Sequence, residues 1–215
     1  MEMIYINEMF RSHQGTGRCA GQLQFFVRFQ GCSVKCPIRH ICDEPQSLPE
    51  PHTRTQDAFS VDQIVQEAIK SVGTGGWIHI TGGEPLQNLS GWKTLVRESF
   101  KAGLRVQTQT SGLIDHCLPI GRSGMITVSP KTTVDKLKLK TGSELVLVAA
   151  PWVSTSIARN LFSGTTFSDY YIAPAFLGNN EWSNKIALDL INDLFEEGQP
   201  EWKLTHQIHK IFGAK

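Results

Sequence analysis

Three cysteines lie within eleven residues of the chain, Cys32, Cys36 and Cys42, directly after a β-rich run. Cysteine thiolates hold iron–sulfur clusters, and a four-iron cluster with only three protein ligands keeps one iron free for a further ligand. An iron with a free position implies chemistry and not only electron storage. The segment GCSVKCPIRHICDEP therefore predicts a 4Fe-4S cluster that takes part in a reaction.

Structural zinc is the alternative interpretation of the same segment. His40 lies between Cys36 and Cys42 and could complete a Cys3His tetrahedron. Structural zinc sites usually pair close ligand couples from two separate segments, whereas these four side chains crowd into one loop. The cluster is therefore favoured. Cys19 and Cys117 have no ligand partners nearby in the sequence, and we expect both to be ordinary free thiols.

Two further motifs follow strand-like runs. Gly82 and Gly83, in the motif GGEP, come directly after the run WIHIT, and glycines at such a position let a ligand approach the backbone without a Cβ in the way. Taken alone, GGEP also fits a simple turn from strand to loop. The motif VSPK at residues 128–131, taken alone, fits a strand followed by a turn.

The elements that position these motifs alternate between strands and helices. Short β-rich runs predict strands at residues 25–29, 77–81, 104–110, 125–129, 144–149 and 170–173. Ser60 followed by Gln63 predicts a capped helix; two more helices are expected over 92–102, ending at Gly103, and around 187–195, ending before Gly198. Such alternation predicts parallel strands joined by helical crossovers. Because a complete eight-fold barrel needs about 250 residues, we expect an incomplete α/β barrel in a single domain over residues 1–215.

The composition is that of an ordinary globular protein, with 40% hydrophobic and 19% charged residues. A formal net charge of +1 leaves no electrostatic footprint for nucleic acid, so direct binding of DNA or RNA is not expected. The sequence has no secretory signal pattern and no apolar run of about 18 residues. We therefore expect a cytoplasmic protein without a membrane span, whose cysteines are reduced.

Residues 43–58 lack periodicity and predict a covering loop, part of a cluster loop at about 30–58.

Several motifs in order give a resemblance to a known family. NEMFRSHQGTG with FVRFQGC, then ITGGEPLQ, VSPK and WKLTHQIHK resemble the 7-carboxy-7-deazaguanine synthases, radical S-adenosylmethionine (SAM) enzymes of 7-deazapurine (queuosine-type) biosynthesis. The resemblance covers nearly the whole chain. It implies a modified radical SAM barrel with a 4Fe-4S cluster, SAM and Mg²⁺, which converts 6-carboxy-5,6,7,8-tetrahydropterin to 7-carboxy-7-deazaguanine and releases ammonia. It also implies a homodimer and a reducing protein such as a flavodoxin or ferredoxin.

The resemblance assigns site residues by position. The cluster ligands are Cys32, Cys36 and Cys42, and the residues facing SAM are Ile41, Asp43, Gly83, Glu84, Ser129, Pro130 and Lys131. The substrate residues are His13, Gln14, Gly15, Arg28 and Thr81, with Lys215 as the last residue of the chain. Arg28 is the most informative, because a substrate carboxylate needs a planar, permanently charged partner that makes two parallel hydrogen bonds. Otherwise an arginine on this strand would simply point to water.

The sequence departs from the family pattern at three places. Five residues separate Cys36 from Cys42, where family members usually have two, so the loop is enlarged. His40 then lies in the enlarged segment and is not expected to be a ligand. Thr16 stands where the family has glutamate. Glu44 stands where the family has the threonine that helps to coordinate magnesium; a carboxylate remains a suitable oxygen ligand, although it is longer and charged.

Two other functions compete with this one. A radical SAM enzyme acting on another substrate, such as a glycyl-radical activase, would share the cysteines and GGEP but not the HQG and HKIF segments. A non-enzymatic zinc-binding interaction module would account for a Cys3His site and leave GGEP, Arg28 and VSPK unexplained.

Overall fold

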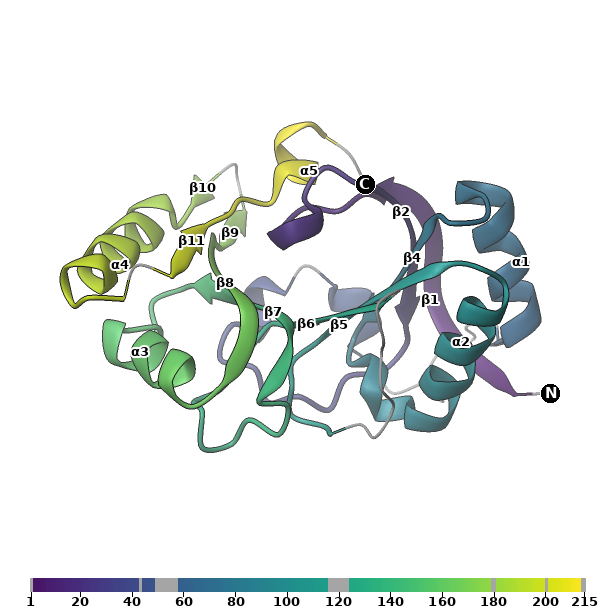
Figure 1. Ribbon diagram of the computed structural model, residues 1–215, viewed down its shortest axis with the longest axis horizontal. Coiled ribbons are helices and arrows are strands. Elements are labelled where there is room, and N and C mark those ends of the chain that lie inside the picture. Colours follow the sequence, from purple (N-terminus) through teal and green to yellow (C-terminus); the bar gives the residue numbers. More distant parts are fainter. Residues whose placement is uncertain are drawn as a thin grey trace.

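The computed structural model describes residues 2–42, 44–48, 58–115, 124–178, 181–199 and 201–213. Within them, nine strands form one curved sheet in the order β11-β8-β7-β6-β5-β4-β2-β1-β3 (Figure 1). Their bounds are β1 (Met3–His13), β2 (Leu23–Phe29), β3 (Ala58–Ser60), β4 (Trp77–Gly82), β5 (Arg105–Thr110), β6 (Gly124–Val128), β7 (Thr141–Ala149), β8 (Thr166–Pro174) and β11 (Trp202–Leu204). A separate hairpin joins β9 (Phe176–Gly178) to β10 (Glu181–Trp182).

The middle of the sheet is parallel. From β2 through β4, β5, β6, β7 and β8 to β11, each neighbouring pair runs parallel, whereas β1 pairs antiparallel with both β2 and β3. Parallel strands bring their carboxyl ends to one edge, where barrel enzymes build their sites. The two outermost described strands, β11 and β3, do not pair with each other, so the curved sheet is the expected incomplete α/β barrel.

Helices cover the outside of the curved sheet, with α1 (Val61–Val72) and α2 (Leu89–Lys101) at one end and α3 (Thr155–Ser163) and α4 (Asn184–Glu196) at the other (Figure 1). The core lies between these helices and the strands. Trp92 of α2 is fully buried there, and its indole nitrogen donates to Thr108 of β5 at 3.0 Å. A short helix, α5 (Ile208–Ile211), lies near the end of the chain. No helix in the described part of the chain is long and apolar enough to cross a membrane.

The six predicted strands and three predicted helices are confirmed, with shifted ends. Gly103 follows α2 with φ +77°, as the end of that helix requires. The sequence did not predict β1, because burial along it does not alternate cleanly, nor the short elements α3 and β11. Of the expected loop at 43–58, residues 45–47 form a 3₁₀ turn and Ala58 begins β3, while 43 and 49–57 lie outside the described residues.

The predicted capping box at the start of α1 gives a test of the fold. Gln63 donates its backbone N–H to the Ser60 hydroxyl at 3.3 Å, and its side-chain oxygen accepts from the Ser60 N–H at 2.8 Å. Ser60→Ala should lower the free energy of unfolding by about 1 kcal/mol, because the helix then begins with unsatisfied donors. Ser71→Ala, inside the same helix, is the control and should not destabilise. Equal urea midpoints for the two variants would contradict the capping role.

Candidate functional site

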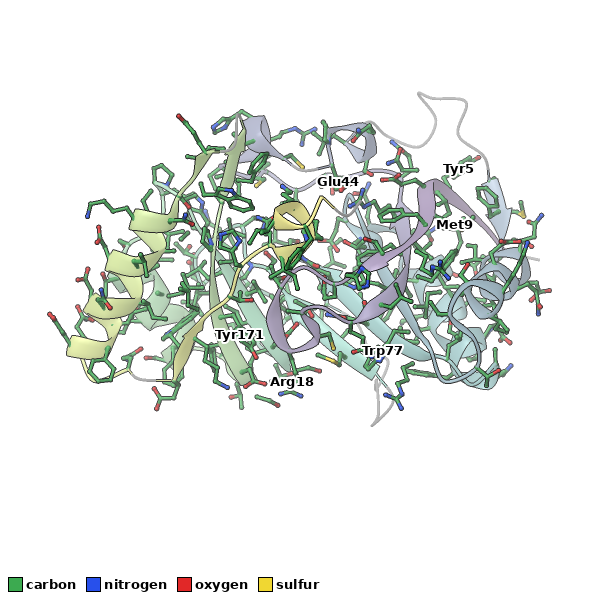
Figure 2. All side chains as sticks on the ribbon, turned by 90° about the horizontal axis from the view of Figure 1, so that it is seen from above. Tyr5, Met9, Arg18, Glu44, Trp77 and Tyr171 are labelled. Carbon is green, nitrogen blue, oxygen red and sulfur yellow. The ribbon has the colours of Figure 1, made fainter. Side chains whose placement is uncertain are left out.

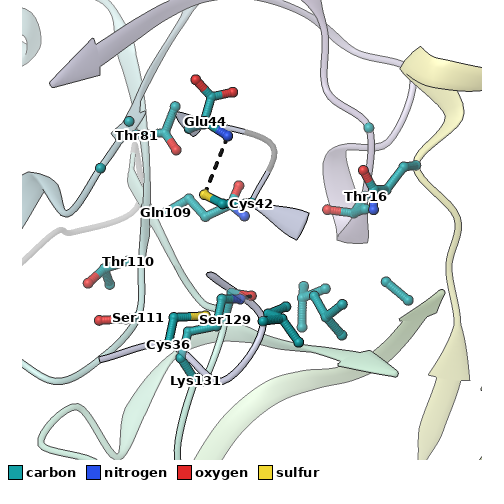
Figure 3. A pocket seen from close by; sticks show the side chains of 18 of the residues that line it. Thr16, Cys36, Cys42, Glu44, Thr81, Gln109, Thr110, Ser111, Ser129 and Lys131 are labelled. Carbon is teal, nitrogen blue, oxygen red and sulfur yellow. Dashed lines mark hydrogen bonds between the residues drawn. The ribbon is translucent and has the colours of Figure 1, made fainter. Parts of the chain in front are cut away.

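A cavity of about 260 Å³ lies at the carboxyl edge of the parallel strands (Figure 3). Residues at or just beyond four successive strand ends line it, namely Thr81, Thr110, Ser129 and Val148. The loop after β2 forms another wall, and the segment after β1 and the last helix complete it. Residues from His13 to His209, almost the whole length of the chain, therefore line this one cavity.

The three candidate cluster ligands, Cys32, Cys36 and Cys42, all line this cavity, and none of them forms a disulfide. The Cys42 sulfur accepts from the backbone N–H of Glu44 at 3.4 Å. Burial raises the pKa of the Cys32 thiol. Among the described residues, no three histidine, cysteine, aspartate or glutamate side chains already surround one point as metal ligands. Three thiols and no fourth cysteine on the described wall still match the donor set of a four-iron cluster with one free iron position.

His40 takes no part in this wall. Its side chain is exposed and does not line the cavity, so the structure does not bring it together with the three thiols as a Cys3His site requires. Cys19 is a buried free thiol that contacts the sulfur of Met125 at 3.4 Å, as expected for an ordinary core cysteine. Cys117 lies outside the described residues.

Backbone hydrogen bonds from the GGEP motif position the cluster loop. The N–H of Gly83 donates to Phe29 at 3.0 Å, and that of Glu84 donates to Gly31 at 2.9 Å. Gly82 has φ +118°, a conformation that favours glycine, and a Cβ on Gly83 would lie 2.1 Å from the Gly31 oxygen. The two glycines are therefore needed because the backbone of the GGEP motif approaches the backbone of residues 29–31 closely. This close approach fixes the start of the loop that carries the cysteines.

The residues predicted to face SAM divide into two groups. Ile41, Gly83, Ser129 and Lys131 line the cavity, and the Lys131 ammonium donates to the Ser129 hydroxyl at 2.7 Å. Glu84 and Pro130 are not on its wall, and Asp43 lies outside the described residues. The buried Glu84 carboxylate accepts from the side chain of Thr110 and from the backbone and side chain of Ser111. Both of these partners line the cavity, so Glu84 braces the wall from behind.

The predicted substrate residues His13, Gln14, Gly15, Arg28 and Thr81 all line the cavity, while Lys215 lies outside the described residues. Gln14 is buried; its side-chain oxygen accepts from Gly15 N–H at 2.7 Å, and its Nε2 has no hydrogen-bond partner among the described residues. A Cβ on Gly15 would lie 1.9 Å from the His209 ring, so only glycine lets α5 close against this segment.

Arg28 lies between two carboxylates inside the cavity and does not point to open water. It forms ion pairs with Glu8 and, at 2.6 Å, with Glu44, and its guanidinium carbon lies 4.8 Å from the centre of the Phe10 ring. Its side chain is 20% exposed, and its Nε lacks a hydrogen-bond partner among the described residues. The cluster loop thus places the Glu44 carboxylate on the arginine predicted to bind a carboxylate. Figures 2 and 3 show Glu44 on this loop, and Figure 3 draws the hydrogen bond from its backbone nitrogen to the Cys42 sulfur.

Several cavity residues were not predicted from the sequence. Thr16, named only as a departure from the family, lies on the wall. His79 and Gln109 line the cavity from β4 and β5, and Gln207 and His209 reach it from the last segment. A signal for His79 was present, because it lies two residues before Thr81 and strands place such residues on one face. Nothing in the spacing of residues along the sequence indicated that Glu8 would form an ion pair with Arg28.

Comparison with known proteins identifies the family. A 7-carboxy-7-deazaguanine synthase from Synechocystis is 30% identical over 218 residues, covering 98% of this chain and 93% of that protein. The chain belongs to the 7-carboxy-7-deazaguanine synthase family. The synthase from Aquifex aeolicus is 29% identical and covers 99% of this chain and 95% of its own length. The crystal structure of QueE from Escherichia coli has the same fold, with a TM-score of 0.70 at 21% identity over 95% of this chain. No protein-family profile matches the sequence.

Family membership confirms the resemblance predicted from the motifs, and the fold agrees with a modified radical SAM barrel. Because 7-carboxy-7-deazaguanine synthases are radical SAM enzymes, the family implies a 4Fe-4S cluster and SAM for this protein. A glycyl-radical activase or a zinc-binding interaction module is not favoured by these relatives. The three thiols, the GGEP glycines and the predicted substrate residues line one cavity, and this arrangement fits the same chemistry.

Proposed function

We propose that this protein is a radical SAM lyase that contracts the ring of 6-carboxy-5,6,7,8-tetrahydropterin to give 7-carboxy-7-deazaguanine and ammonia. One observation carries the proposal. A single cavity holds the three thiols suited to the cluster and, with the segment His13–Gly15, the half-buried cation Arg28 suited to the substrate carboxylate. When bound, the cluster and SAM supply one-electron radical chemistry, and the protein supplies orientation and charge.

The roles follow from the side chains on the wall. Cys32, Cys36 and Cys42 would hold the cluster, and Arg28 would bind the substrate carboxylate through two parallel hydrogen bonds. Gln14 keeps a buried donor without a protein partner, which suits an acceptor atom of the substrate. We assign SAM to the side of the cavity lined by Ile41, Gly83, Ser129 and Lys131, where Glu84 holds Thr110 and Ser111 in place. Pro130 is assigned to the same side because it lies between Ser129 and Lys131 in the sequence. We also propose that Asp43 faces SAM and that Lys215 contacts the substrate.

Glu44 is proposed to switch between two partners. In this structure its carboxylate pairs with Arg28, which is also the partner proposed for the substrate. Two carboxylates that share one cation leave excess negative charge, and a divalent cation with oxygen ligands would offset it. We therefore propose that Mg²⁺ binds Glu44 when the substrate carboxylate binds Arg28.

Glu44→Gln tests the magnesium role. The variant should need about tenfold more Mg²⁺ for half-maximal turnover, because a neutral amide is a weaker ligand than a carboxylate. It should bind the substrate more tightly than wild type in the absence of Mg²⁺, since Arg28 loses a competing charge. Titration of turnover and of substrate binding with MgCl2 measures both effects. Glu67→Gln, on the exposed face of α1, is the matched control. Unchanged Mg²⁺ dependence in Glu44→Gln would remove this role.

The remaining proposals concern the setting of the enzyme. We propose one radical SAM domain over residues 1–215 with its cluster loop at about 30–58, a cytoplasmic homodimer, and a flavodoxin or ferredoxin as reductant. The family supports these proposals by analogy. The function itself is tested by anaerobic turnover: the product mass should appear only when the pterin, SAM, a reductant and the clustered protein are all present, and its absence from a fully clustered protein would overturn the substrate assignment.

A further inference from the structure

A chain of buried polar side chains crosses the interior of the sheet beneath the cavity. Five side chains on five successive strands are fully buried: Gln24, His79, Gln107, Thr127 and Glu144. Buried polar groups are costly unless they are hydrogen-bonded. These five form a chain of hydrogen bonds in the order His79, Gln24, Gln107, Thr127 and Glu144. Only one member, His79, lines the cavity.

The direction of each hydrogen bond follows from the carboxylate at the far end. Burial raises the pKa of Glu144, while its hydrogen-bond donors and the charge of Arg18 lower it. Its carboxyl oxygens accept from the Thr127 hydroxyl at 2.7 Å and from the backbone N–H of Arg18 at 2.8 Å. The Thr127 oxygen in turn accepts from the Gln107 amide nitrogen at 3.0 Å. The remaining amide oxygen of Gln107 must therefore accept from its next neighbour, which it does from the Gln24 nitrogen at 2.9 Å.

The same logic fixes the tautomer of His79. The Gln24 amide oxygen lies 2.8 Å from His79 Nδ1, and two acceptors cannot form a hydrogen bond, so Nδ1 carries the proton. Burial lowers the pKa of His79 to about 3, so the ring is neutral at pH 7. The side chain of Gln109, which lines the same cavity, interacts with the ring and raises this pKa, whereas the positive charge of Arg28 lowers it. Nε2 then carries only a lone pair. It has no partner of ordinary hydrogen-bond geometry among the described residues.

Stacking holds the ring of His79 in place. The ring lies 4.6 Å from that of Phe26, which stacks in turn on Phe10 at 5.3 Å, below the Arg28 guanidinium. Thr81 pairs with Arg28 across the two strands, so His79 lies one step deeper, roughly 7 Å along the strand. The carboxylate of 6-carboxy-5,6,7,8-tetrahydropterin is attached to the reducible ring of the pterin. When this carboxylate binds Arg28, the reducible ring is therefore the part of the pterin that lies closest to His79.

We propose that His79 Nε2 accepts a hydrogen bond from a ring N–H of the bound pterin and so selects the tetrahydropterin over the oxidised, aromatic pterin. The assignment rests on the proposed function. The reducible ring of a tetrahydropterin carries two N–H donors, whereas the same nitrogens in an aromatic pterin carry lone pairs. Facing an aromatic pterin, Nε2 would meet an acceptor and remain unpaired. A site built to accept a substrate N–H discriminates strongly against an analogue that lacks it.

The test compares two ligands on the full-length, clustered protein under anaerobic conditions. Dissociation constants are measured for 6-carboxy-5,6,7,8-tetrahydropterin and for pterin-6-carboxylate, which share the carboxylate and differ in the ring N–H groups. Wild type should prefer the reduced ligand by about tenfold or more. His79→Asn keeps a donor for Gln24 but has no acceptor at the Nε2 position, and should lose most of that preference by weakening binding of the reduced ligand. His40→Asn makes the same change at an exposed position and should keep the wild-type ratio.

Nitrogen NMR of the His79 ring in wild type gives a second measurement that depends on no variant. Nδ1 should be protonated and Nε2 unprotonated at pH 7, and the Nε2 signal should shift with the reduced ligand more than with the oxidised one. A protonated Nε2, or a preference for the reduced ligand that survives in His79→Asn, would overturn the proposal. If wild type forms product while the ratio is unchanged in His79→Asn, only this proposal fails. If the ratio falls in His79→Asn but no ring-contracted product forms, His79 keeps its selective role and the proposed function fails.

Discussion

Cys36→Ala should yield a protein that folds but lacks most of its iron and has no measurable turnover. A four-iron cluster held by three thiolates cannot lose one protein ligand and keep its site, and the chemistry depends on the cluster. The same loss is expected for Cys32→Ala and Cys42→Ala, because all three thiols line the same cavity. Iron and sulfide content after anaerobic purification, together with the visible absorbance of the cluster, measures the effect.

Cys19→Ala is the matched control. Cys19 is buried against Met125 and away from the cavity, so its loss should leave iron content and turnover intact and cost only a small packing energy. If Cys36→Ala retained full iron while Cys19→Ala lost it, the ligand assignment would be wrong. A colourless wild-type protein with stoichiometric zinc and no iron would contradict the cluster itself.

Arg28→Ala should reduce kcat/KM on the order of a hundredfold while cluster content stays normal. The change removes both charge-assisted hydrogen bonds proposed for the substrate carboxylate. It also leaves Glu44 on the cavity wall, and Glu8 beside it, without their cation, so that their negative charges repel the substrate. Arg28→Lys should recover only part of the loss, since an ammonium is a point charge without the planar fork of a guanidinium.

Stability needs its own measurement in this experiment, because Arg28 also holds two carboxylates of the protein. Arg11→Ala removes an exposed arginine of β1 whose side chain donates to the Ser71 carbonyl at 3.4 Å, and it should leave kcat/KM unchanged. Thermal unfolding of both variants separates lost binding from lost structure. Normal substrate affinity and rate in a folded Arg28→Ala protein would remove Arg28 from the substrate site.

Local patterns predicted much of the scaffold and the chemistry. The strands β2, β4, β5, β6, β7 and β8 were found because each is a short β-rich run next to turn residues, and the cysteines were found because they are close in sequence. The strand β1 was missed, since it pairs with strands on both sides and its exposure does not follow a period of two.

Long-range polar contacts could not be predicted in this way. Glu44 reaches Arg28 across 16 residues, and Gln24 reaches Gln107 across 83 residues, so only the folded sheet brings them together. His79 illustrates the same limit within a predicted strand. The sequence places it on the face of Thr81, but its tautomer depends on a carboxylate two strands further on than Gln107. Contacts between residues close in sequence were therefore predictable, whereas contacts made across the sheet were not.

The central claim is that this cavity contracts a pterin ring, and the most direct measurement is product mass from anaerobic turnover with less SAM than substrate. The clustered protein is incubated with 6-carboxy-5,6,7,8-tetrahydropterin, Mg²⁺ and a chemical reductant, and the products are followed by mass spectrometry. The account predicts 7-carboxy-7-deazaguanine and ammonia in equal amounts, exceeding the SAM supplied, because SAM acts as a regenerated cofactor. Unaltered substrate, or product limited to the amount of SAM, would contradict it.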